Sequence, residues 1–371
     1  PQALEFDLIL RIIDGQGLGA IEHLTEPLLS CESPSLHPNP DEITALERHL
    51  HNRGYTAHQV REYPARHYHI HYGHTAEPLV SIIVPTKDQL PILRRCVETL
   101  LEKTQYFNYE LIIVDNDSQT EEALAWLAEL DAIGGQKIRV LRYPYPFNYS
   151  AINNFAVTQS KGEYVVLLNN DTAILDGGWL HALLNHAQRP EVGVVGAKLL
   201  FPNGLIQHAG VVVGLDGPAG HPFIGQPAAT PGYMQRVMVD QNYSAVTAAC
   251  LMIRRSIYEE VAGLDEDLFK VSYNDVDLCL KVGAQGYLIV WTPHALLLHE
   301  GSVSQTHVDR TAFAAKLKRF RSEQHGMMSK WLPVMANDPA YNRNLSLEDN
   351  GFRIDGRTEL TWRPLKGLPL P

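Results

Sequence analysis

The sequences LVSIIVPT at residues 79–86 and YELIIVDND at residues 109–117 decide the fold of this chain. Each is a short apolar run rich in β-branched residues, which is typical of a strand buried on both faces. Strands that alternate with helices predict an α/β fold with a Rossmann-like, mostly parallel central sheet and flanking helices. The alternation continues with helices expected at residues 91–103, 121–130 and 148–159, and strands at 138–141 and 163–168.

Polar side chains gather where these strands end, at residues 86–88, 115–118 and 169–171. In a parallel sheet, the carboxyl ends of the strands form the ligand-binding edge. The third cluster, Asn169-Asn170-Asp171, is the most informative, because a carboxylate there is able to hold a divalent cation that binds a diphosphate. A turn after the strand explains the same residues without any ligand.

Two further positions carry chemistry in the second half of the chain. Asn274 is a good helix N-cap, and Asp277 completes an arrangement like a capping box, so both are interpreted as structural. Asp275 is not needed for capping, which leaves it free for another role or for pairing with the helix dipole. His299 follows an apolar strand, where a lone histidine is usually only polar surface.

The regular alternation ends after residue 171. Pro and Gly are frequent over residues 201–232, which indicates loops and short antiparallel pieces. The expected later elements are a strand over 244–253, helices that begin at Ser256 and Asn274, and short strands at 287–291 and 295–298.

The strand ends, the acid-bearing helix and the strand-ended histidine follow one another along the chain in a set order. In this order they resemble the motifs of family 2 glycosyltransferases of the GT-A fold, over about residues 77–335. Two additional motifs, FNYSAINN at 147–154 and QHAG at 207–210, resemble bacterial enzymes that build O-antigens and related surface polysaccharides, often rhamnosyltransferases. The family motifs are matched by VPT at 84–86, IVDN at 113–116, LNND at 168–171, TAAC at 247–250, NDVDL at 274–278 and HEGS at 299–302.

The resemblance implies a role for each matched residue. Asp171 corresponds to the last acid of the family's DXD motif and would bind the metal, Mg²⁺ or Mn²⁺, with His299 as the second protein ligand. Asn169 replaces the first acid of that motif, and Asn274 replaces the Glu that usually precedes the general base, Asp275. Contacts with the nucleotide sugar are implied for Pro85, Thr86, Asp115, Asn153, Asn170 and Ala248.

The resemblance therefore predicts an inverting glycosyltransferase. It would move a sugar from a nucleoside-diphosphate donor, such as dTDP-rhamnose or a UDP-sugar, to a saccharide or lipid-linked saccharide acceptor. The alternative is a GT-A module that has lost its activity and binds a partner, which the loss of Asp171 or Asp275 would have favoured. A nucleotidyltransferase would need a Gly-rich loop after the first strand, and TKDQ at 86–89 has no glycine.

The composition restricts the partners and the compartment. The 371 residues carry a formal net charge of -11 without a basic stripe, which argues against nucleic acid as the main partner. No apolar run is long enough to span a bilayer. The four scattered cysteines are typical of reduced thiols. We therefore expect a cytoplasmic protein, with a peripheral position at the inner membrane face as an option.

The first residues resemble a later part of the same chain. EFDLILR at 5–11 aligns with DVDLCLK at 275–281, and residues 23–29 resemble residues 291–297. Residues 1–36 are therefore expected to be the remnant of an upstream GT-A domain of the same chain. Such a remnant would pack as a helix and a short extended piece, outside the cleft.

Two other segments flank the catalytic region expected at 77–335. Residues 37–76 predict a linker with a helix that runs from an Asp41 cap to residue 52. The linker also contains a strand over residues 66–74, whose histidines are expected to face water. Residues 336–371 are polar and Pro-rich and predict a surface tail.

Overall fold

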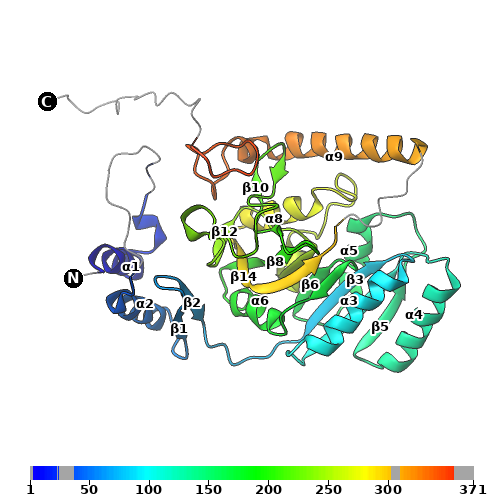
Figure 1. The fold of residues 1–371 in the computed structure, drawn as a ribbon, viewed down its shortest axis with the longest axis horizontal. Coiled ribbons are helices and arrows are strands. Elements are labelled where there is room, and N and C mark those ends of the chain that lie inside the picture. The colour runs from blue at the N-terminus through cyan, green and yellow to red at the C-terminus, as the bar shows by residue number, and fades with distance from the viewer. Residues whose placement is uncertain (1–2, 23, 25–36, 302–309, 355–371) are drawn as a thin grey trace.

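The fold is that of a computed structural model, which describes residues 3–22, 24, 37–301 and 310–354. Figure 1 shows a large α/β body, a small helical unit at the N-terminal side and a long helix, α9, along one edge. The repeat predicted at 23–29, except residue 24, lies outside the described residues, as does the tail over 355–371.

The first half of the sheet has the predicted parallel topology. Strands β3 (Val80–Thr86), β4 (Tyr109–Asp115) and β5 (Ile138–Arg142) are parallel neighbours, and β6 (Tyr164–Leu168) pairs in parallel with the other edge of β3. Every residue of β3 and β4 is buried, in agreement with their unbroken apolar runs. The connecting helices are α3 (Leu90–Lys103), α4 (Glu121–Gly134) and α5 (Tyr149–Gln159).

The second half of the sheet is mixed. β13 (Cys250–Arg254) lies antiparallel between β6 and β8 (Val192–Leu200), and β14 (Leu288–His299) is parallel to β8. The two short strands predicted here form one strand, β14. Its register against β8 shifts between Thr292 and Leu296, at the gap between the two predicted strands. The short strands of this half are β7 (Thr172–Ile174) and β12 (Gln241–Tyr243) on β14, and β9 (Ile206–His208) on β8.

The sequence located these later elements less well. The strand predicted at 244–253 begins only at Cys250. Residues 247–249 are not part of the sheet and line a cleft instead. β8 and the preceding helix α6 (Trp179–Ala187) were not predicted, although β8 is completely buried. The other elements here are α7 (Arg255–Glu260), α8 (Asn274–Ala284), the hairpin of β10 (Val212–Val213) and β11 (Ala219–Gly220), and η2 (Tyr233–Gln235).

Alternate side chains of the sheet enter two hydrophobic clusters on its opposite faces. Along β3, Ile82 and Val84 pack in the cluster that contains Leu93 of α3, whereas Ile83 packs in the cluster that contains Ile152 of α5. The sheet is thus covered by helices on both sides, and its functional groups are left to the strand ends. The cysteines within the described residues, Cys96, Cys250 and Cys279, are buried and unpaired, in agreement with reduced thiols.

The N-terminal helices form a small unit beside the sheet (Figure 1). α1 (Leu4–Gln16) packs on α2 (Pro40–Asn52), and Asp7 pairs with Arg48. Asp41 lies inside the first turn of α2 and is not the predicted cap, because the helix already begins at the preceding proline. The described part of residues 1–36 also includes a short turn, η1 (Leu18–Ala20), and lines no part of the cleft described below. Its origin in an upstream domain stays a prediction.

The hairpin of β1 (Gln59–Glu62) and β2 (Tyr68–His71) contains the predicted strand. Its histidines do not form a wet face: His67 is buried, and the ring of His69 stacks on that of His294 at a centroid distance of 3.5 Å. Burial, together with the charges of His294 and His71, lowers the pKa of His69 to about 4. The expectation was wrong because the hairpin packs against β14 through these rings.

The last helix, α9 (Arg310–Ala336), runs along the outer edge of the molecule (Figure 1) and was not predicted. The segment after it folds back onto the domain, with Asp338, Tyr341 and Leu345 buried. The predicted surface tail is therefore wrong for these residues, which pack against the domain. None of the helices in the described ranges is long and apolar enough to cross a bilayer.

Asp338 fastens the segment after α9 and provides a test of this packing. Its carboxylate accepts hydrogen bonds from the backbone N–H groups of Val213 (2.7 Å) and Ala340 (2.8 Å) and from the Ser244 hydroxyl. Asp338→Ala leaves buried donors without an acceptor, so we expect the free energy of unfolding to fall by roughly 2–4 kcal/mol in urea denaturation. Asp349→Asn, at an exposed position of the same segment whose left-handed backbone asparagine also tolerates, is the control, and an equal loss in both variants would contradict the packing.

Candidate active site

A cleft of about 670 Å³ opens at the carboxyl ends of β3 and β6. This is the edge at which a doubly wound sheet binds ligands. Two of the predicted site residues, Asp115 and Asn153, do not line it. The predicted residues that do are Pro85, Thr86, Asn170, Asp171, Ala248, Asp275 and His299.

The register of the sheet brings Asp171 and His299 together. β7 and β14 pair antiparallel with His299 opposite Thr172, the residue that follows Asp171. As a result, Oδ1 of Asp171 lies 3.0 Å from Nε2 of His299, and the two side chains are only 12% and 9% exposed. Within the described ranges, no further His, Cys, Asp or Glu joins them to form a set of three metal ligands.

Two amide side chains orient the ring of His299. Oε1 of Gln207 lies 2.9 Å from Nδ1, and Nδ2 of Asn169 lies 3.2 Å from Nε2. Because an amide oxygen accepts and an amide nitrogen donates, these partners favour the tautomer with its proton on Nδ1. The lone pair of Nε2 then lies 3.0 Å from Oδ1 of Asp171, and two such acceptors side by side favour a positive charge between them. Such an outer hydrogen bond is the usual support of a metal-binding histidine.

Asp275 lies in the first turn of α8 and is held against the cleft wall by backbone donors. Its Oδ2 accepts a hydrogen bond from the N–H of Ala248 at 3.0 Å, and its Oδ1 accepts one from the N–H of Val276 at 2.8 Å. Asp275 therefore joins α8 to the loop before β13. The carboxylate keeps further lone pairs for a ligand in the cleft.

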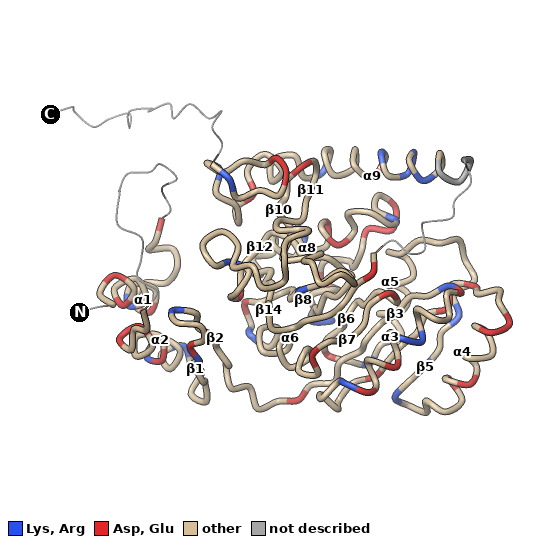
Figure 2. The backbone as a smooth tube through the Cα atoms, viewed as in Figure 1, with Lys and Arg blue, Asp and Glu red and all other residues tan. Residues whose placement is uncertain are grey.

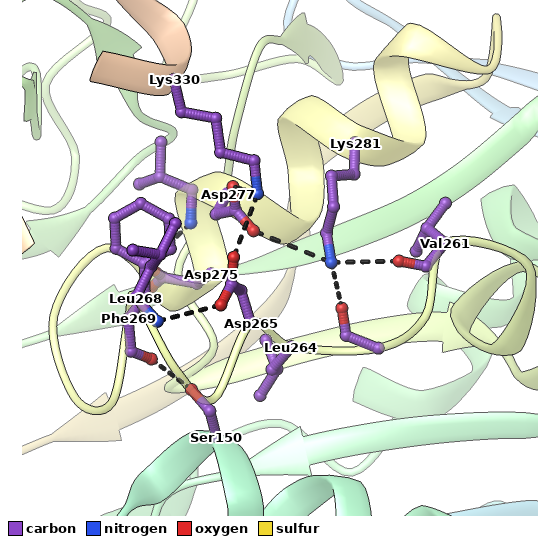
Figure 3. Close-up of polar contacts among 12 residues, drawn as sticks. Ser150, Val261, Leu264, Asp265, Leu268, Phe269, Asp275, Asp277, Lys281 and Lys330 are labelled. Atoms are coloured by element: carbon purple, nitrogen blue, oxygen red, sulfur yellow. Dashed lines mark hydrogen bonds and ion pairs between the residues drawn. The ribbon is translucent and has the colours of Figure 1, made fainter. Parts of the chain in front are cut away.

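The capping role predicted for Asn274 and Asp277 is wrong. The residue before α8 is Tyr273, which makes no side-chain capping bond, and the Asn274 amide donates backward to the carbonyl of residue 271. Asp277 is fully buried, and its Oδ1 lies 2.8 Å from both Nε1 of Trp331 and Nζ of Lys330. Figure 3 shows Lys330 reaching from α9 toward this carboxylate. Asp277 is structural, but it connects two helices instead of capping one.

Asp115 and Asn153 lie behind the cleft wall. Asp115 is 1% exposed, and its Oδ1 accepts a hydrogen bond from the N–H of Ser118 at 2.9 Å, so it shapes the loop after β4. The amide of Asn153 donates to the carbonyl of Tyr149 one helical turn earlier, at 2.8 Å. Asn116, the neighbour of Asp115, lines the cleft in its place. The nucleotide contacts implied for Asp115 and Asn153 stay predictions.

The cleft residues without a role assigned from the sequence include Tyr149, Gln207, Lys316 and Arg319. The Tyr149 hydroxyl lies 3.2 Å from both Oδ1 of Asn169 and the carbonyl of Ala248. Burial and the charge of Asp275 raise the pKa of Tyr149, so it serves as a neutral donor.

Lys316 and Arg319 come from α9, where Figure 2 marks several basic residues. The basic run KLKRFR at residues 316–321 was a visible signal, but nothing local linked it to the strand ends. Only the packing of α9 over the cleft reveals that these two cations face the same space as Asp171 and Asp275. They give an otherwise acidic cleft a positive side.

Comparison with known proteins identifies relatives of this chain. The chain is 44% identical over 361 residues to an uncharacterised protein of Sinorhizobium fredii, covering 94% of this chain and 39% of that protein. It is 41% identical over 372 residues to the O-antigen biosynthesis protein RfbC of Myxococcus xanthus, covering 94% of this chain and 27% of that protein. It is 28% identical over 174 residues to an N-acetylglucosaminyl-diphospho-decaprenol L-rhamnosyltransferase of Mycobacterium tuberculosis, covering 44% and 56%. The chain thus spans less than two thirds of each of these relatives.

Two solved structures share the fold. One is the mannosyltransferase PcManGT of Pyrobaculum calidifontis in complex with GDP-Man and Mn²⁺, with a TM-score of 0.50, 16% identity, and coverage of 70% of this chain and 65% of that chain. The other is GalNAc-T7 with UDP, GalNAc and Mn²⁺, with a TM-score of 0.52, 13% identity, and coverage of 70% and 58%. Residues 81–262 match the model of Glycosyl transferase family 2. The chain therefore carries a family 2 glycosyltransferase domain of the GT-A fold, as the sequence motifs predicted.

Proposed function

We propose that the chain is an inverting, metal-dependent glycosyltransferase that moves a sugar from a nucleoside-diphosphate donor to an acceptor hydroxyl. The observation that carries this proposal is the presence of Asp171, Asp275 and His299 around one cleft at the carboxyl edge of the sheet. A partner-binding module without activity has no need for a base and a cation-binding pair in the same cleft. The observation therefore favours the enzyme over that alternative.

Asp171 and His299 fit a divalent cation as two of its ligands. Their contacting atoms are 3.0 Å apart, which is close enough for both side chains to hold one ion. With two protein ligands, the other positions are left to water and diphosphate oxygens, as is usual for Mg²⁺ bound with phosphates. When bound, Mg²⁺ or Mn²⁺ would neutralise the charge that develops on the departing diphosphate.

Asp275 is the proposed general base. It takes the proton of the acceptor hydroxyl while that oxygen bonds to the anomeric carbon and the bond from this carbon to the diphosphate oxygen breaks. Attack and departure occur on opposite faces of the sugar in one displacement, so the configuration at the anomeric carbon inverts. The backbone hydrogen bonds from residues 248 and 276 hold the carboxylate in place for this transfer.

The rest of the cleft suits a nucleoside diphosphate. Pro85 and Thr86 form the wall at the end of β3, and the Thr86 hydroxyl accepts a hydrogen bond from Asn170 at 3.1 Å, which joins the ends of β3 and β6. Lys316 and Arg319 bring positive charge to the side where the diphosphate would lie. Asp115 and Asn153 support this wall from behind and would touch the nucleotide only after a local movement.

The named relatives support a role in surface polysaccharide synthesis. RfbC is an O-antigen biosynthesis protein, and the mycobacterial relative is a rhamnosyltransferase named for a diphospho-decaprenol substrate. We therefore infer dTDP-rhamnose or a UDP-sugar as the donor and a saccharide or lipid-linked saccharide as the acceptor. A cytoplasmic protein, peripheral at the inner membrane face, would meet such an acceptor. A donor-hydrolysis screen across nucleotide sugars with Mg²⁺ or Mn²⁺ identifies the donor.

Asp275→Asn tests the base. Asparagine has nearly the same size but does not take up the acceptor's proton, so we expect the transfer rate to fall by about 10²–10⁴-fold. Binding of the nucleoside diphosphate, measured by calorimetry, should stay within about twofold because the base does not hold the donor. Asp267→Asn, an exposed acid of a nearby loop, is the matched control and should transfer normally. Near-normal turnover by the Asp275 variant would sink the assignment.

Removal of the metal and of its proposed carboxylate ligand tests the second half of the site. EDTA should abolish transfer, and added Mg²⁺ or Mn²⁺ should restore it. Asp171→Ala should weaken the binding of Mn²⁺ in the presence of nucleoside diphosphate by at least about tenfold, as followed by electron paramagnetic resonance. Asp267→Ala should bind Mn²⁺ like the unaltered chain. Full activity in chelator would refute metal dependence.

A further inference from the structure

The turn that leads into Asp275 has an unfavourable backbone conformation. Tyr273, two residues earlier, has a φ of 61° and a ψ of 5°. This is the left-handed region, in which a residue with a Cβ is crowded against its own carbonyl. A non-glycine residue persists there only where the surrounding structure fixes it. Side chains of α9 supply several of the contacts that fix this turn.

Three residues of α9 hold this turn. Glu323 is 2% exposed and accepts hydrogen bonds from the backbone N–H groups of residues 271 and 272, at 3.0 and 3.3 Å. The ring of Phe320 stacks on that of Tyr273 with centroids 5.8 Å apart, and the Gln324 amide lies 3.5 Å from the Tyr273 hydroxyl. The buried carboxylate of Glu323 is the strongest of these contacts, because two backbone donors depend on it.

A second contact of α9 lies on the other side of Asp275. Lys330 places its ammonium 2.8 Å from the buried Asp277 carboxylate and 3.2 Å from Asp265. Figure 3 shows the Lys330 side chain between these two acids. Trp331 donates to the same oxygen of Asp277, and Lys281 of α8 lies 3.7 Å from the other oxygen. A carboxylate that is fully buried needs such cations, since an unpaired charge there is strongly destabilising.

Lys330 keeps its positive charge at neutral pH. Its partial burial acts against the charge, but the hydrogen bond and the charge of Asp277, followed by those of Asp265, raise the pKa of Lys330 above its usual value. Lys330 therefore keeps its positive charge opposite Asp277 at neutral pH.

The same helix also borders the substrate cleft. Arg319 lines the cleft, and its Nε lies 3.9 Å from Glu323, the residue that holds the turn. That Nε is buried and makes no hydrogen bond in the structure. One helix thus presents a cation to the cleft, binds the backbone N–H groups of residues 271 and 272 before Asp275, and pairs with the side chain of Asp277 after it.

We propose that Glu323 and Lys330 are positioning residues for sugar transfer: α9 clamps residues 271–277 at both ends and so sets the place of the Asp275 carboxylate in the cleft. The proposal rests on the proposed role of Asp275 as the base. Neither residue touches the reacting atoms. Both act through the turn, so their loss should slow the proton-transfer step without removing donor binding.

Two substitutions test the clamp. Glu323→Gln keeps the shape of the side chain, but only one oxygen is left to accept the two backbone hydrogen bonds that two oxygens accept now. Lys330→Met removes the positive charge opposite Asp277. We expect kcat for transfer to fall about 10- to 100-fold in each, the cost of a small misplacement of a catalytic group. The dissociation constant of the nucleoside diphosphate should stay within about twofold. Lys330→Arg should recover most of the rate, and Lys318→Met, on the exposed side of α9, is the matched control.

A double-mutant cycle separates positioning from general damage. In an Asp275→Asn background there is no base left to position, so adding Glu323→Gln or Lys330→Met should slow the residual rate by less than about twofold. A merely structural effect would instead multiply with the loss of the base. Melting temperatures of all variants show whether Lys330→Met still folds, and Glu323→Gln carries the test if it does not.

The outcomes are distinct. Suppose that Asp275→Asn is inactive, as the proposed function requires. An unaltered kcat in Glu323→Gln then overturns the clamp, and so do rate losses that multiply in the double-mutant cycle. Normal turnover in Asp275→Asn itself overturns the proposed function, and the clamp with it. A loss of nucleotide affinity as large as the loss of kcat also counts against the clamp, because it assigns Glu323 and Lys330 to general folding of the cleft.

Discussion

The pairing of β7 with the last residues of β14 is the constraint on which the cleft depends. It places His299 opposite Thr172 and closes with a hydrogen bond from the Glu300 N–H to the Asp171 carbonyl at 3.1 Å. A slip of one residue in this pairing would turn the imidazole to the other face of the sheet. β14 reaches this position only because its register against β8 shifts between Thr292 and Leu296. An irregularity in one strand thus decides where two functional side chains meet.

Much of the fold was predictable, because β3, β4 and β6 each carry their signal within their own sequence. The candidate site was predictable as far as family motifs extend, which includes Asp171 and Asp275. Several failures share one cause: they concern side chains whose partners lie far along the chain. Asp277 matched a local capping rule, yet its partners are more than 50 residues later on α9. Cleft residues such as Arg319 were missed for the same reason, since α9 has no motif and no strong apolar face.

Buried carboxylates make the docking of the last part of the chain specific, beside apolar side chains such as Met327 and Tyr341 that enter the core. Leu317, Met328 and Leu332 of α9 are 38%, 47% and 58% exposed, so the helix leaves much of its apolar surface in water. Glu323 and Asp338 instead insert into the domain and bind its backbone donors. Such groups tolerate few alternative positions, because each needs its partner at hydrogen-bond distance. The docking is therefore specific even where the packing is loose.

The position of α9 near the end of the described chain has a consequence for synthesis. A ribosome releases the sheet strands β3 to β14 before residues 310–336 emerge, and domains begin to fold as they are made. Until α9 has left the ribosome, Glu323 is absent and the left-handed turn at Tyr273 lacks the hydrogen bonds that this carboxylate provides. The nascent sheet is thus able to assemble while its cleft is still unfinished. Catalytic geometry is completed last, after the strands that frame it are already paired.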